Sequence, residues 1–145
     1  MPKSYFDGSV WCNVDVALNR VGLFLKNEIE PLGLNLIEWY VLRFLYEQDG
    51  QQASQIAKGV GRAATSFTPI LDKLEEKSLI ERQSHPSDRR AVKVYLTKRG
   101  RALEKQVNDS AIKIDQELRT RFSDKDWKGF EQVIIELQTM LPSSG

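Results

Sequence analysis

The chain has 145 residues, 41% of them hydrophobic and 28% charged, which is the size and composition of one globular domain. One cysteine and one histidine exclude an internal disulfide and a His-rich metal site. No apolar run approaches the roughly 18 residues of a membrane span, the start of the chain lacks a signal-peptide pattern, and the net charge is only +1. We therefore expect a cytoplasmic protein that needs no cofactor or metal.

The first third of the chain predicts two helices. Apolar residues recur every three or four positions over residues 10–29, which is the spacing of one helix face, and this helix should end before Pro31. Asn35 with Glu38 three residues later forms a capping-box pattern. This pattern predicts a second helix that runs to about Glu47.

The middle of the chain predicts a helix-turn-helix. A short helix over residues 53–60 is closed by Gly61, since glycine reaches a positive φ without strain. A second helix should begin near Thr65 and continue to Lys77. Pro69 lies inside that helix, which must therefore either begin late or bend there.

The apolar period then changes from 3.6 to 2, which is the period of a strand. Residues 79–82 and 92–96 predict two antiparallel strands, joined by residues 85–90 as the tip of a hairpin. Segment 51–105 carries twelve basic and six acidic residues, a net charge of +6, whereas the segments before and after it carry −3 and −2. A basic hairpin directly after a helix-turn-helix predicts a winged helix-turn-helix.

The last third predicts a long helix capped by Thr97 and running to Phe122, and a final helix opened by Ser123 with Asp126. The long helix would measure roughly 36 Å, although a compact chain of this length has a radius of gyration of only about 15 Å. The first and last helices carry apolar stripes, whose mutual burial across a two-fold axis predicts a homodimer. These stripes contain Val10, Trp11, Val14 and Val21, and Trp127, Phe130, Ile134 and Leu141.

We therefore expect a mainly α fold with a small β-hairpin. Residues 1–34 form an N-terminal helix of the dimerisation region, residues 35–100 the winged helix-turn-helix with its wing at 79–97, and residues 101–145 the C-terminal dimerisation helices. The dimer would present its two recognition helices about one DNA turn apart.

The second helix of a helix-turn-helix enters the major groove with its N-terminal end. The candidate contacts there are Arg62, Thr65, Ser66 and Thr68, with capping of the helix as the alternative role for Thr65 and Ser66. At the hairpin tip, Arg89 and Arg90 could enter the narrow minor groove.

Asp88 is interpreted as a structural carboxylate that orients an arginine through a bidentate ion pair. The alternative for this tip is an exposed charged turn with no partner. Four further cations would either contact phosphates or simply be solvated. They are Lys93, Lys98, Arg99 and Arg101.

Three stretches resemble the MarR family of multiple antibiotic resistance regulators. They read SQIA at 54–57, LEEKSLIER at 74–82 and DRRAVKVYLTKRG at 88–100. The resemblance implies a homodimeric repressor or activator, with repression favoured, that binds a pseudo-palindromic operator and is often released by a small, frequently aromatic, molecule. By position, Asp88 and Arg90 match the Asp-x-Arg motif of the family's wing, and Thr65, Ser66, Thr68 and Pro69 fall on its recognition helix. Ala63 and Ala64 depart from it, since many members have a polar capping residue there.

Runs 30–34 and 66–71 are closer to the organic-hydroperoxide-sensing branch of that family, which uses a reactive cysteine near the N-terminus. Counting back from residue 30, the sensing position falls on Trp11, and Cys12 follows it about 100° further around the helix. We therefore expect Cys12 to pack as a small hydrophobe, with a redox sensor as the alternative.

Two other classes of function compete with this interpretation. An enzyme is not expected, because His85 lies on a hairpin tip and general-base catalysis needs fixed geometry. A winged-helix adaptor for another protein would share the fold without needing arginines on the wing.

The candidates for lining an effector crevice are Phe24, Trp39, Tyr40 and Arg43. Aromatic residues more often belong to the core, so we assign no ligand site.

Overall fold

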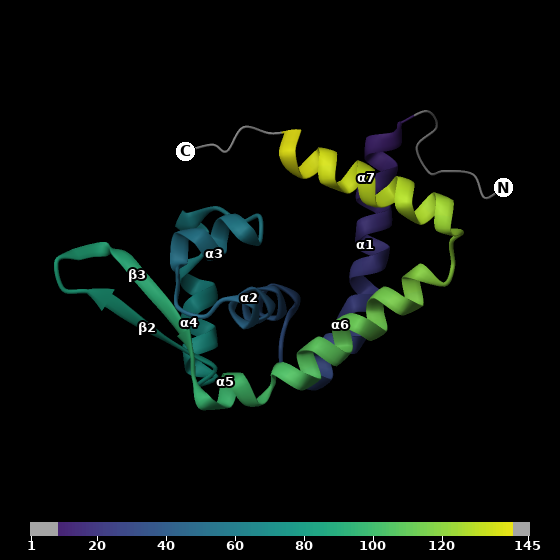
Figure 1. Cartoon of the computed structure of the whole chain (residues 1–145). Helices are drawn as coiled ribbons and strands as arrows, with labels where there is room; N and C mark the ends of the chain where they lie inside the picture. The colour runs from purple at the N-terminus through teal and green to yellow at the C-terminus, as the bar shows by residue number, and fades with distance from the viewer. Residues whose placement is uncertain (1–8, 141–145) are drawn as a thin grey trace. The chain divides into compact units, whose positions relative to one another are not determined.

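The computed structural model describes residues 9–140, apart from the side chains of His85, Arg89 and Arg90. The chain divides into two compact units, one reaching to Ser110 and one starting at Ala111, so that the boundary falls inside a helix (Figure 1). The elements are α1 (Val10–Ile29), η1 (Glu30–Leu32), α2 (Leu36–Glu47), β1 (Gln51–Gln52), α3 (Ala53–Gly59), η2 (Ala64–Ser66), α4 (Thr68–Glu76), β2 (Ile80–His85), β3 (Asp88–Leu96), α5 (Lys98–Ala102), α6 (Glu104–Arg119) and α7 (Asp124–Met140).

Both N-terminal helices agree with the prediction. α1 ends at Ile29 and passes into η1, and Gly33 then turns the chain with a φ of 76°. The capping box of α2 is present in full: the backbone N–H of Glu38 donates to Oδ1 of Asn35 at 2.9 Å, and the N–H of Asn35 donates to Oε1 of Glu38 at 2.8 Å.

The helix-turn-helix forms as predicted, with one change at the second helix. Gly61 has a φ of 69°, and the N–H of Arg62 closes the turn on the carbonyl of Ala57 at 2.8 Å. The start near Thr65 is wrong, because α4 begins at Thr68 after the short helix η2. A proline lacks the N–H that a deeper position would need, so the late start places Pro69 in the first turn.

The sheet has three antiparallel strands in the order β1-β3-β2, one more than predicted. β1 pairs with β3 through Gln51 opposite Val94. The predicted tip at 85–90 is too long, since β2 and β3 are joined by a turn of residues 86–87 alone. Asp88, Arg89 and Arg90 therefore lie on the first part of β3 rather than in a loop.

The predicted long helix from Thr97 to Phe122 is wrong, because it breaks at Leu103 and ends at Arg119. The N–H of Leu103 bonds to the carbonyl of Gly100 at 3.3 Å, which is the tighter three-residue pattern. Contacts from elsewhere fix Gly100: the Tyr46 hydroxyl donates to its carbonyl at 2.7 Å, and an added Cβ would lie 2.1 Å from the carbonyl oxygen of Leu79. Burial, together with the charge of Glu104, raises the pKa of Tyr46 to about 12.

The core of the first unit lies among α2, α3, α4 and the sheet. Trp39 of α2 is buried, and its Nε1–H donates to Oγ of Ser110 on α6 at 3.0 Å. The fully buried side chains include Leu42, Leu45, Ile56, Phe67, Leu74, Val94 and Val107. α4 packs against this core through Leu71 and Leu74, which are both buried. Within residues 9–140, no helix is both long and apolar enough to cross a membrane.

Candidate nucleic-acid interface

α4 buries one face and exposes the other. Phe67, Leu71 and Leu74 repeat at helical spacing and are all buried against the first unit. The four residues predicted to contact DNA at the start of this helix, Arg62, Thr65, Ser66 and Thr68, are all exposed. Arg62 precedes η2, Thr65 and Ser66 belong to it, and Thr68 is the first residue of α4.

The start of α4 carries no side-chain cap among the described residues. Its N-cap position is Phe67, whose side chain has no oxygen to accept a hydrogen bond. Ser66 instead donates its hydroxyl to the carbonyl of Ala63 at 3.1 Å. The capping role considered for Thr65 and Ser66 is therefore wrong for α4. η2 leads directly into α4, so the N–H of Phe67 bonds to the carbonyl of Ala64 at 3.3 Å and that of Ile70 to the carbonyl of Phe67 at 3.1 Å.

The strand β3 carries the charged residues of the wing. Asp88 is exposed and its backbone pairs with that of His85, so Arg89 and Arg90 follow directly after the turn. Lys93 is exposed between Gln52 and Gln83, its partners on the two neighbouring strands. The orientation of an arginine by Asp88 stays a prediction.

The other wing cations have different surroundings. Lys98 and Arg99 are exposed at the start of α5. Arg101 forms an ion pair with Asp49 at 2.6 Å, and Asp49 also accepts from the N–H of Leu96 at 2.8 Å. Arg101 therefore joins α5 to the turn before β1. This structural role was not predicted from the sequence.

Sequence analysis missed a contact that joins the wing to α4. The guanidinium of Arg82 on β2 bonds to Asp72 and, at 2.8 Å, to Glu75, both on α4. The backbone N–H of Arg82 also donates to Glu75 at 3.0 Å. The hydrogen bond from the Arg82 side chain holds the pKa of the Glu75 carboxyl below its usual range. The sequence does hold a signal for this contact. Asp72 and Glu75 lie three residues apart on one helix, and Arg82 follows early in the next strand.

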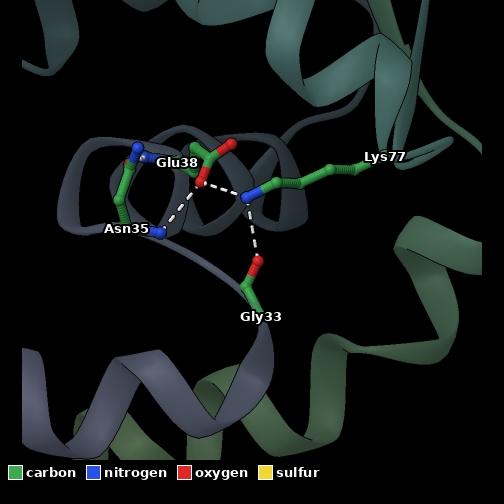
Figure 2. Close-up of polar contacts among 4 residues, drawn as sticks. All are labelled: Gly33, Asn35, Glu38 and Lys77. Carbon is green, nitrogen blue, oxygen red and sulfur yellow. Dashed lines mark hydrogen bonds and ion pairs between the residues drawn. The ribbon is translucent and has the colours of Figure 1, made fainter.

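A second missed contact holds the C-terminal end of α4. Lys77, the C-cap residue of this helix, forms an ion pair at 2.7 Å with Glu38, which is 1% exposed (Figure 2). The sequence predicted Glu38 only as the partner of Asn35 in a capping box. A carboxylate inside an otherwise apolar stretch of α2 was the available signal, because buried charges need partners.

Cys12 is exposed in the structure of the single chain. Because α1 is expected to lie in the dimer interface, the packing of Cys12 as a small hydrophobe stays a prediction. The redox alternative stays a prediction. Trp39 belongs to the core, and Arg43 lies over its ring with the guanidinium carbon 4.9 Å from the centroid.

The chain is similar in sequence to known regulators. Residues 34–92 match the model of the MarR family. The HTH-type transcriptional regulator MhqR of Bacillus subtilis is 36% identical over 101 residues, which cover 69% of this chain and 70% of that protein. The HTH-type transcriptional repressor Rv2887 of Mycobacterium tuberculosis is 29% identical over 124 residues, covering 83% of this chain and 89% of that protein.

The fold is similar to that of a solved structure, the S. aureus MepR–DNA complex. The TM-score is 0.82 at 20% sequence identity, and the match covers 93% of this chain and 100% of that chain. This likeness confirms the expected fold class, a winged helix-turn-helix between N- and C-terminal helices. Given the family match and the identity to MhqR, the chain belongs to the MarR family of transcription regulators.

Proposed function

We propose that this protein is a DNA-binding transcriptional repressor that acts as a homodimer on a pseudo-palindromic operator. α4 enters the major groove with Arg62, Thr65, Ser66 and Thr68, and Arg90 enters the minor groove. The observation that carries the proposal is the exposure of all four candidate contact residues at and just before the start of α4. Two similar proteins support it, since Rv2887 is a transcriptional repressor and MepR was solved in complex with DNA.

The charge distribution supports DNA as the partner. The +6 charge lies in residues 51–105, which contain the helix-turn-helix and the wing. Neutralising phosphates releases counterions, so affinity for DNA must fall as salt rises. An adaptor that recognises a protein through apolar contacts would show little salt dependence.

Exposed apolar side chains support the homodimer. On α1, Trp11 is 64% exposed, and Val10, Leu18 and Leu23 are exposed as well. On α7, Ile135 is 60% and Phe130 53% exposed. Large apolar side chains exposed on each of these helices favour association with a second chain, and a two-fold dimer would place two recognition helices about 34–36 Å apart. Leu141, also predicted for this surface, lies outside the described residues. Release by a small aromatic effector is part of the proposal through the family resemblance alone.

The proposal is tested with Arg90→Ala after the operator has been selected from genomic fragments. Removing one groove contact should weaken operator binding about 10- to 100-fold. The dimer mass and the thermal midpoint should change little, because Arg90 lies on β3 close to the hairpin turn. The measurements are binding titrations at several salt concentrations, light scattering and calorimetry.

Lys105→Ala is the matched control, since it also removes one positive charge but from α6, where Lys105 pairs with Asp109 on the same helix. It should leave operator affinity within about twofold. A comparable loss of stability in Arg90→Ala would contradict the recognition role. Binding of the wild type that does not change with salt would favour the adaptor.

A further inference from the structure

The carboxylate of Glu38 joins three separate segments of the first unit. Its Oε1 accepts from the backbone N–H of Asn35 at 2.8 Å and from Nζ of Lys77 at 2.7 Å. The same Nζ donates to the backbone carbonyl of Gly33 at 2.9 Å. Figure 2 shows Lys77 reaching from α4 to both acceptors. We call these four residues the Glu38 clamp.

The Glu38 clamp contacts the C-terminal end of α4 and the turn that follows α1 and η1. Lys77 is the C-cap of α4, the recognition helix of the proposed function. Gly33 directly follows η1, which continues α1, and its N–H bonds to the carbonyl of Glu30 at 2.9 Å. Two of the contacts in the clamp are to backbone atoms, the N–H of Asn35 and the carbonyl of Gly33. Backbone atoms move less freely than the ends of long side chains. The clamp therefore joins the end of α1 to the end of α4.

Stability alone does not account for an ion pair whose carboxylate, on Glu38, is buried. Taking a carboxylate out of water is costly, and an apolar pair of similar volume is often as stable or more stable. The second oxygen of Glu38, Oε2, is also buried with no hydrogen-bond partner among the described residues, which adds to the cost. An ion pair differs from an apolar pair in its directional contacts, which favour a single geometry.

We propose that Glu38 and Lys77 are positioning residues for DNA recognition, which fix the angle of α4 relative to α1. In the dimer this angle sets the spacing of the two recognition helices, and hence the half-site spacing that the protein accepts. The inference rests on the proposed function. It adds that operator spacing is controlled by two residues that touch no DNA.

The first test measures the geometry without DNA. Spin labels on Asn27→Cys in α1 and Lys73→Cys in α4, both exposed positions, are placed in a Cys12→Ser background. Labelled chains are diluted with unlabelled protein, so that pulsed electron resonance reports the distance within one chain. Glu38→Gln keeps the shape and the acceptor oxygen but removes the charge, and should at least double the width of the distance distribution in folded protein.

Glu30→Gln is the matched control, because its carboxylate forms an exposed ion pair with Lys26 at 3.5 Å outside the clamp. It should leave the width unchanged. If Glu38→Gln does not fold, the double variant Glu38→Gln/Lys77→Met removes both charges and should show the same broadening. An unchanged width in either folded variant overturns the inference.

The second test uses operators whose half-site spacing is changed by one base pair in each direction. The wild type should prefer its own spacing at least tenfold, and Glu38→Gln should reduce this preference to about threefold or less. A purely structural role would lower the thermal midpoint without changing the preference of the folded protein, and that result overturns the inference. Failure of the wild type to bind any operator contradicts the proposed function itself, so the two failures are distinguishable.

Discussion

The two ends of α4 are built in opposite ways. The N-terminal end carries small exposed side chains, begins at an uncapped Phe67 and is open to a partner. The C-terminal end is held by Lys77 on Glu38, and the wing strand is tied to the same helix through Arg82. A helix that must present one end to a large rigid partner needs its other end fixed, because any rotation there displaces the presented side chains. We therefore propose that the residues at the N-terminal end contact DNA, and that Lys77 and Arg82 hold the helix in place.

The largest effect is expected from breaking the clamped end with Lys77→Met. The side chain of Lys77 is 39% exposed but Glu38 is 1% exposed, so the substitution leaves a buried carboxylate without its cation. Removing one partner of a buried pair is strongly destabilising, and we expect a loss of about 3 kcal/mol in the free energy of unfolding, measured with urea.

The control for this prediction removes the remaining charge. The double variant Glu38→Gln/Lys77→Met buries no unpaired carboxylate and should recover at least about half of the lost stability. If the double variant is no more stable than Lys77→Met alone, the destabilisation does not come from the isolated charge of Glu38.

Substitutions at the N-terminal end of α4 should lower operator affinity rather than the stability of the fold. The double variant Thr65→Ala/Thr68→Ala removes two exposed hydroxyls, and we expect operator affinity to fall about tenfold while the free energy of unfolding changes by less than about 0.5 kcal/mol. Thr139→Ala, on exposed α7, is the control and should leave affinity unchanged. Equal losses in both variants would mean that the hydroxyls at the start of α4 do not contact DNA.

The same contrast explains what could be predicted from the sequence. The capping box of Asn35 and Glu38 and the turn at Gly61 depend on residues within a few positions, so local pattern was sufficient. β1 exists only through its pairing with β3, and Lys77 lies 39 residues from Glu38. The break at Leu103 depends on the approach of Gly100 to Leu79. Contacts between distant segments leave no periodic trace in the sequence, so the contacts that Lys77 and Arg82 make were missed.

The smallest effect is expected at the contact between the wing and α4, and it should depend on pH. Arg82 lowers the pKa of Glu75, and a carboxyl whose pKa is lower in the folded state contributes stability above its unfolded pKa of about 4.3. That contribution is lost as pH falls through the pKa of Glu75 in the folded protein.

Arg82→Gln should therefore lower the free energy of unfolding by up to about 1 kcal/mol at pH 7, because the pair is partly exposed. The difference from wild type should shrink below about pH 4 in thermal unfolding measured at several pH values. A difference that stays constant down to pH 2 would mean that the guanidinium stabilises the wing by packing rather than through the Glu75 carboxylate.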